Sequence, residues 1–192
     1  MNIGIIGRAR VGKDTAGAWL VEHRGYQRVA FADPLKEAAL KLDPIVVTDD
    51  DYYDTPGDHL STVVDYWDWE FAKDNFPEVR RILQELGAAV RAIDEDFWLR
   101  AALAKVAEAN EAGKPAVITD VRYPNETESL RRAGFDLVYI HRPDAPRLDH
   151  ESEGAIQAQE ADHIVINDES VADLQREMWL IHDQITRRTR SL

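Results

Sequence analysis

One short loop near the start of the chain limits the fold more than any other feature of the sequence. An apolar run, residues 3–6, is followed by Gly7-Arg8-Ala9-Arg10-Val11-Gly12-Lys13, and then by residues 16–21, where apolar side chains recur at helical spacing. Between a strand and a helix, the pattern G-x-x-x-x-G-K is typical of a loop whose backbone N–H groups and lysine bind phosphate. The sequence therefore predicts a polyphosphate site after the first strand, with Lys13 reaching the β- and γ-phosphates of a nucleotide.

The residues after this lysine depart from the usual pattern. A Ser or Thr that binds Mg²⁺ normally follows the lysine directly, whereas here Asp14 intervenes and Thr15 comes one position later. Two interpretations stay open. Either Asp14 approaches Mg²⁺ directly or through water, with the Thr15 hydroxyl left for a phosphate, or Asp14 interacts only with the positive end of the helix dipole. The residues expected to bind the nucleotide are Gly7, Arg10, Val11, Gly12, Lys13, Asp14 and Thr15.

Apolar runs of strand length alternate with segments of helical periodicity along most of the chain. The expected strands are residues 3–6, 26–31, 116–119, 135–140 and 163–166. The expected helices are residues 16–21, 34–42, 78–93, 96–112, 126–133 and 171–188. Such alternation predicts an α/β fold with a mostly parallel sheet, helices on both faces and ligands at the carboxyl ends of the strands. With 192 residues, one domain is the expected organisation.

Two stretches lack a clear period. Residues 43–77 contain aspartates at positions 49–51 and 54 and a Pro56-Gly57 turn signal, and we interpret them as an inserted flap over an acceptor site. The aromatic residues of this flap, Trp67 and Trp69 among them, are expected to anchor it to the core rather than to stack on a ligand. Residues 141–160 are charged and irregular, which suits either a mobile lid over the site or an ordinary surface loop.

The composition narrows the classes of partner. The chain has a formal net charge of −13 at pH 7, which repels polyanions and argues against non-specific binding of nucleic acid or of an acidic membrane. Cysteine is absent, which excludes disulfides and thiolate metal sites. Neither a signal peptide nor a long apolar span is recognisable, so we expect a cytoplasmic protein. The sequence leaves the oligomeric state open, a homodimer included.

Six separated segments together carry a family resemblance. They are GRARVGKDT (7–15), FADPLKE (31–37), LQELG (83–87), DVRYPNE (120–126), HESE (150–153) and ADHIVINDES (161–170). In this order they resemble the phage deoxynucleoside monophosphate kinases, a branch of the P-loop nucleoside monophosphate kinase superfamily, whereas residues 43–77 have no counterpart. The resemblance implies a three-layer α/β fold, ATP and Mg²⁺ as cosubstrates, and conversion of a deoxynucleoside monophosphate to its diphosphate.

The resemblance, together with the chemistry of the side chains, assigns further site residues. Those expected to bind the acceptor are Asp33, Lys36, Arg80, Gln84, Arg122, Glu126 and Arg142. Those expected to act in catalysis are Lys13, Asp33, Arg122 and Arg147, and the expected metal ligands are Asp14, Thr15 and Asp120. Arginine suits these roles because its planar guanidinium matches two phosphate oxygens.

Several of these residues also have plainer interpretations. Asp33 can cap the helix that follows it, with Lys36 in solvent. Asp120 can be a turn residue, and Glu126 can begin the next helix. Arg80 and Gln84 can face solvent from an amphipathic helix. In function, the alternatives are a P-loop kinase for another phosphorylated metabolite, such as dephospho-coenzyme A or phosphomevalonate, and a nucleotide-binding subunit without transfer activity.

Overall fold

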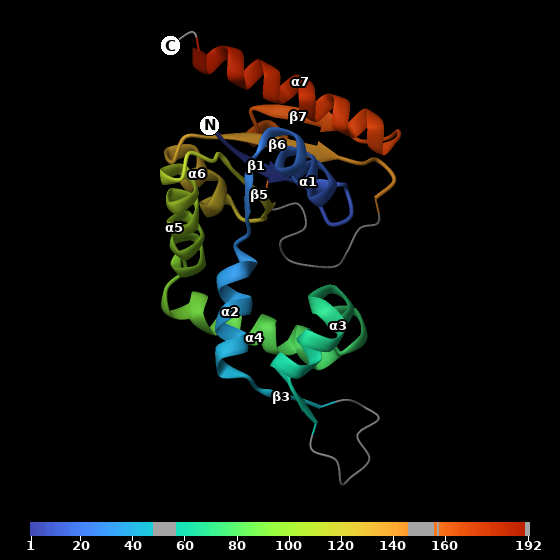
Figure 1. Cartoon of the computed structure of the whole chain (residues 1–192), viewed down its shortest axis with the longest axis vertical. Coiled ribbons are helices and arrows are strands. Elements are labelled where there is room, and N and C mark those ends of the chain that lie inside the picture. The colour runs from blue at the N-terminus through green and yellow to red at the C-terminus, as the bar shows by residue number, and fades with distance from the viewer. Residues whose placement is uncertain (48–56, 146–155, 157, 191–192) are drawn as a thin grey trace. The chain divides into compact units, whose positions relative to one another are not determined.

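The computed structural model describes residues 1–47, 57–145, 156 and 158–190. The chain forms two compact units, Met1–Phe31 with Ala102–Leu192, and Ala32–Ala101 (Figure 1). That both belong to one domain stays a prediction. In the part of the chain that the structure describes, no helix is both long and apolar enough to cross a bilayer.

The first unit contains a five-stranded sheet. Its strands are β1 (Asn2–Ile6), β2 (Gln27–Val29), β5 (Ala116–Val121), β6 (Phe135–His141) and β7 (His163–Ile166). They lie in the order β2-β5-β1-β6-β7, and every pairing is parallel. All five residues of β1 are buried, as expected for a central strand covered on both faces. The predicted parallel sheet is confirmed.

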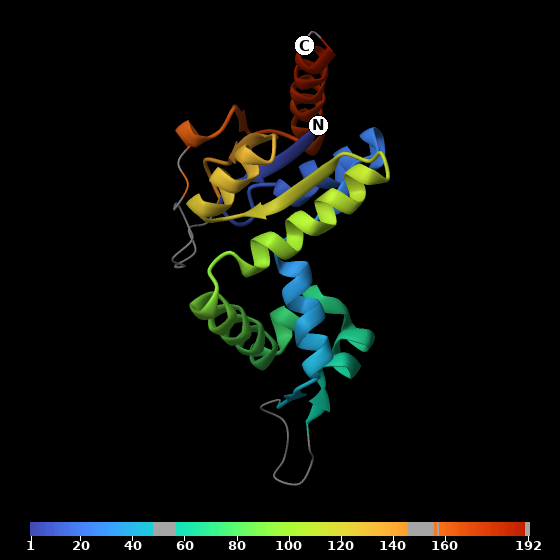
Figure 2. The same cartoon turned by 90° about the vertical axis from the view of Figure 1, so that its left-hand side faces the viewer.

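Helices cover both faces of this sheet (Figure 2). The helices of the unit are α1 (Lys13–Arg24), α6 (Pro124–Arg132), α7 (Val171–Arg190) and most of α5 (Phe97–Glu111), with a short 3₁₀ turn at Ala158–Glu160. On one face, α1 and α7 share a core with the strands, which includes Leu20, Val138 and Met178. On the other face, Leu130 of α6 lies over Gly4 of β1 and Leu137 of β6. The three-layer α/β fold is therefore confirmed.

The second unit is mostly helical. Its elements are α2 (Ala32–Leu42), the antiparallel pair β3 (Ile45–Val46) and β4 (Asp58–His59), α3 (Leu60–Asn75) and α4 (Pro77–Ile93). Its core joins Ala39 of α2, Leu60 and Val63 of α3, and Val79 of α4. Because α2 begins at Ala32, Asp33 lies in its first turn and does not precede the helix as a cap.

Residues 43–77 lack a clear period in the sequence, yet α3 occupies Leu60–Asn75. That this stretch is a flap over an acceptor site stays a prediction. The helix is kinked at Asp68, whose φ of 62° and ψ of 170° are not helical. The Asp68 Oδ1 accepts hydrogen bonds from the backbone N–H groups of Glu70 (2.7 Å) and Phe71 (3.0 Å), so the aspartate caps the turns that follow. The kink interrupts the apolar period, which is why no clear helical pattern is recognisable in this part of the sequence.

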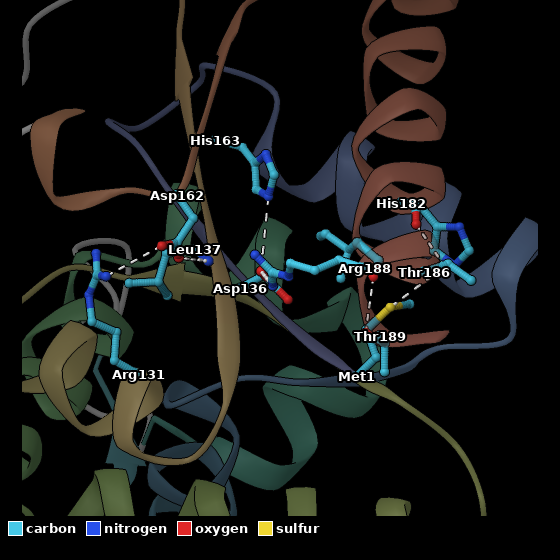
Figure 3. Close-up of polar contacts among 11 residues, drawn as sticks. Met1, Arg131, Asp136, Leu137, Asp162, His163, His182, Thr186, Arg188 and Thr189 are labelled. Atoms are coloured by element: carbon cyan, nitrogen blue, oxygen red, sulfur yellow. Dashed lines mark hydrogen bonds and ion pairs between the residues drawn. The ribbon is translucent and has the colours of Figure 1, made fainter. Parts of the chain in front are cut away.

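A buried carboxylate ties the last helix to the amino-terminal ends of the strands (Figure 3). Asp136 of β6 is 5% exposed and accepts a hydrogen bond from the Arg188 guanidinium of α7. The Nε2 of His163, the first residue of β7, lies 4.0 Å from the same carboxylate. Nearby, Asp162 Oδ2 accepts a hydrogen bond from the Leu137 N–H at 2.8 Å. These contacts hold α7 and the amino-terminal ends of β6 and β7 together.

Candidate active site

The loop between β1 and α1 has the tight curvature that its glycines predict. Gly7 has a φ of 149° and Gly12 a φ of 102°, and Arg10 is also left-handed at 62°. A Cβ placed on Gly7 would lie 2.5 Å from the carbonyl oxygen of Ile140, which as backbone has little freedom to move. A Cβ on Gly12 would lie 2.7 Å from Asn167 Nδ2. The loop can pass this close to β6 and β7 only because both positions are glycine.

The lysine at the start of α1 turns back over this loop. Its Nζ donates hydrogen bonds to the carbonyl oxygens of Gly7 at 2.7 Å and of Arg8 at 2.5 Å. The ammonium group is thereby held against the loop, close to the amides that phosphate oxygens would contact.

A cavity of about 330 Å³ opens beside the loop, at the lower end of the size range of small-molecule sites. It is lined by Arg10, Gly12, Lys13, Asp14, Thr15, Arg142, Asn167, Glu169, Val171 and Leu174. The structure thus brings together five of the seven predicted nucleotide-binding residues and adds Arg142, which follows β6. The remaining wall, from Asn167 to Leu174, was not predicted as part of the site.

The two acidic residues predicted as metal ligands have different surroundings. Asp14 is exposed in the first turn of α1, and its Oδ1 accepts a hydrogen bond from the buried Thr119 hydroxyl at 2.8 Å. Asp120 lies within β5, one residue before its end, and its Oδ1 accepts a hydrogen bond from the Phe31 N–H at 3.0 Å. Thr119 therefore orients Asp14, a role that could not be predicted because a threonine in a buried strand gives no functional signal.

Glu126 and Arg122 follow β5 and lie at the same sheet edge as the loop, since β1 and β5 are parallel neighbours. Glu126 is 7% exposed, and its Oε2 accepts hydrogen bonds from the backbone N–H groups of Arg122 (2.7 Å) and Tyr123 (3.0 Å). The carboxylate thus caps the start of α6 and fixes the backbone of Arg122. The Arg122 side chain is exposed.

The predicted acceptor residues of the second unit lie on two of its helices. Lys36, one turn along α2 from Asp33, places its Nζ 5.4 Å from the ring centroid of Trp69, and Trp69 packs against the core of that unit. Arg80 donates hydrogen bonds to the Lys73 carbonyl and to Asp74 Oδ1, both at 2.6 Å. Gln84 is exposed on α4. Arg147 lies outside the described residues, as do most of residues 141–160.

Comparison with known proteins gives the family. Residues 70–178 match the model of the deoxynucleotide monophosphate kinase family. A putative deoxynucleotide monophosphate kinase of Acanthamoeba polyphaga mimivirus is 26% identical over 184 residues, which cover 89% of this chain and 90% of that protein. An uncharacterized protein of Ictalurid herpesvirus 1 is 36% identical over 101 residues, a match that spans 50% of this chain and only 44% of the viral protein.

Solved structures agree with the fold. A dephospho-CoA kinase from Campylobacter jejuni superposes with a TM-score of 0.54 over 98% of each chain, at 14% identity. A gluconokinase from Sinorhizobium meliloti gives a TM-score of 0.50 over 98% of this chain and 95% of the other, also at 14% identity. At such low identity these likenesses establish the P-loop kinase fold alone. Because the family model covers more than half of the sequence, the chain belongs to the deoxynucleotide monophosphate kinase family and is a nucleotide kinase.

Proposed function

We propose that this kinase transfers the γ-phosphoryl group of ATP to a deoxynucleoside monophosphate and releases ADP and the deoxynucleoside diphosphate. The observation that carries the proposal is the phosphate-type loop beside a cavity, with the Lys13 ammonium held on that loop. Phosphoryl transfer needs little covalent chemistry from a protein, so positioning and neutralisation of charge supply most of the rate.

On the donor side, the loop amides and Lys13 hold the terminal phosphates of ATP. The Lys13 ammonium exchanges its loop carbonyls for β- and γ-phosphate oxygens, and Arg10 and Arg142 add two further positive charges to the same cavity. The dipole of α1, whose first turn follows the loop, favours the negative charge further.

The side chains beside the loop fit Mg²⁺. Asp14 and Thr15 line the cavity with a carboxylate and a hydroxyl, the hard oxygen donors that this ion prefers. Among the residues that the structure describes, no group of three or more His, Asp or Glu side chains could hold a metal alone, which agrees with an ion bound partly by phosphates and water. When bound, Mg²⁺ neutralises phosphate charge. Thr119 keeps the Asp14 carboxylate oriented, and Asp120 is a candidate for a contact through water.

On the acceptor side, an oxygen of the monophosphate attacks the γ-phosphorus in line as the bond to the β–γ bridging oxygen breaks. Arg122 and Arg147 neutralise the phosphate charges, and Glu126 keeps the Arg122 backbone in place. Asp33 and Lys36 orient the sugar or phosphate of the acceptor, and Arg80 and Gln84 contact its base. We also propose that residues 141–160 act as a lid that excludes water.

The setting we propose is cytoplasmic deoxynucleotide metabolism, where both substrates are available. The net charge of −13 supports an enzyme without a nucleic-acid or acidic-membrane partner. Both relatives named above are viral, and origin in a phage stays a prediction, as does a homodimer.

The test is a coupled assay of ADP release with the four deoxynucleoside monophosphates, the ribonucleotides, dephospho-coenzyme A and phosphomevalonate. We expect at least one deoxynucleoside monophosphate to be phosphorylated with Mg²⁺ and no transfer by Lys13→Ala, which should still fold. Activity confined to dephospho-coenzyme A or phosphomevalonate would overturn the acceptor assignment. ATP binding without any phosphorylated product would favour a non-catalytic subunit.

A further inference from the structure

Asn167, the residue after β7, contacts both the phosphate loop and the end of β6. Asn167 is 7% exposed and lines the cavity together with the predicted residues of α1. The Nδ2 amide donates a hydrogen bond to the carbonyl oxygen of Val11 at 2.8 Å, inside the phosphate loop. The backbone N–H of Asn167 donates to the His141 carbonyl at 2.7 Å, directly before Arg142.

The contact with Val11 fixes the orientation of a peptide group that phosphate binding needs. The Val11 carbonyl and the Gly12 N–H belong to one planar trans peptide, so they point in opposite directions. By holding the carbonyl, Asn167 also directs the Gly12 N–H away from itself. The space for this side chain exists because position 12 is glycine, where a Cβ would lie 2.7 Å from Nδ2.

A buried amide is costly to leave without a partner. The hydrogen bond therefore resists rotation of the Val11–Gly12 peptide, which would turn one loop amide away from an anion. Neither Val11 nor Asn167 carries a charge, so the effect acts through geometry.

We propose that Asn167 is a positioning residue for the phosphates of the donor nucleotide, acting through the Val11 carbonyl. The inference rests on the proposed function of the loop as the ATP site. It predicts that loss of the Nδ2 donor weakens the binding of any polyphosphate on the loop, with or without a nucleoside attached.

The experiment compares wild type, Asn167→Ala and Asn167→Asp by calorimetric titration with ATP and, separately, with inorganic tripolyphosphate. We expect Asn167→Ala to weaken both ligands by a similar factor, about tenfold. Asn167→Asp has nearly the same shape, but its carboxylate faces the Val11 oxygen, so it should bind both ligands more weakly still at pH 8. Once protonated, the new carboxyl group can donate again, so the affinity of Asn167→Asp should recover relative to Asn167→Ala as the pH falls to 5.5.

The alanine variant measures how far the affinity changes with pH for other reasons, because the same charged side chains line the cavity in all three proteins. These are Arg10, Lys13, Asp14, Arg142 and Glu169. Should Asn167→Ala not fold, the pH dependence of the wild-type affinity serves as the reference instead. The matched structural control is Asn2→Ala, since Asn2 is 6% exposed and its Oδ1 accepts a hydrogen bond from the Ala116 N–H at 2.8 Å. This control should lower the melting temperature and leave both affinities unchanged.

Three outcomes would overturn the proposal. The first is wild-type affinity of Asn167→Asp for both ligands at pH 8, and the second is a loss of affinity for ATP alone, which would place the amide on the nucleoside. The third is an affinity of Asn167→Asp that changes with pH in parallel to that of Asn167→Ala. If the wild type binds neither ligand, the proposed function of the loop fails together with this inference. If the wild type binds both ligands and the Asn167 variants bind them equally well, this inference fails and the proposed function stands.

Discussion

Two glycines within helices, one in each compact unit, reveal different kinds of packing. Gly17 lies in α1, and a Cβ built on it would be 2.3 Å from Thr119 Cγ2 of the sheet. Gly87 lies in α4, and its Cβ would be 3.4 Å from Leu35 Cδ2 of α2, an ordinary van der Waals distance. Helix α1 therefore meets the sheet with no room for a methyl group, whereas α4 packs on α2 with room for one.

The polar contacts of the two units differ in the same way. In the sheet unit, the carboxylates of Asp136 and Glu126 are buried and bind an arginine or backbone N–H groups. In the helical unit, the pair Arg81–Glu85 lies at the surface, with side chains 54% and 65% exposed. At these two positions the tighter packing is found in α1, which begins at Lys13 of the loop beside the cavity.

Gly17→Ala should give the largest change in stability. The new methyl group meets a β-branched side chain in a buried strand, so we expect a loss of about 3 kcal/mol from overpacking, reduced slightly by the better helix propensity of alanine. Urea denaturation measures this loss in the free energy of unfolding. A variant as stable as wild type would show that α1 can move away from the sheet.

Glu126→Ala should come next, at about 2 kcal/mol, because two backbone N–H groups at the start of α6 lose their acceptor. The control is Glu85→Gln, which removes one exposed partner of Arg81 and should leave the unfolding midpoint unchanged. If both variants lowered the unfolding midpoint equally, buried carboxylates would not stabilise this protein more than surface ones.

Gly87→Ala should change stability in the opposite direction to Gly17→Ala. A methyl group fits beside Leu35, and alanine favours the helix, so we expect a gain of up to about 1 kcal/mol in the same denaturation experiment. Destabilisation at both glycines would mean that the helical unit is packed as tightly as the sheet unit.

The smallest effect concerns pH. Burial, and then the nearby Arg24, lower the pKa of His182 below its usual value of 6.5 in the sheet unit. Protonation thus favours the unfolded chain, and stability should be full above about pH 6.5 and decline as the pH falls below it. His182→Gln should remove this part of the decline in melting temperature between pH 7.5 and 5.5.

A carboxylate of the helical unit should respond in another pH range. The hydrogen bond from Arg100 lowers the pKa of Asp94 from its usual 3.8, so its contribution is present above that value and is lost only in more acidic solution. Asp94→Asn should therefore leave the profile between pH 7.5 and 5.5 unchanged. A change there as large as that of His182→Gln would argue against this separation.

The sequence predicts the sheet unit well because its signals are local. The central strands β1, β5 and β6 are mostly apolar and buried, and the glycines of the phosphate loop lie where left-handed backbone is needed. In the helical unit, α3 could not be predicted from the sequence, because the break at Asp68 hides its helical period. Asn167 and Thr119 could not be assigned from sequence, because their partners Val11 and Asp14 lie 156 and 105 positions away.

The ammonium group of Lys13 already has two carbonyl acceptors. In the donor site that we propose, a triphosphate would replace those neutral acceptors by charged ones, so the gain would come from the charge of the new partners and not from their number. Donor affinity should accordingly fall with rising ionic strength, while a nucleoside without phosphates leaves the lysine where it is. On this proposal, Lys13 would discriminate against unphosphorylated competitors before any base or sugar is recognised.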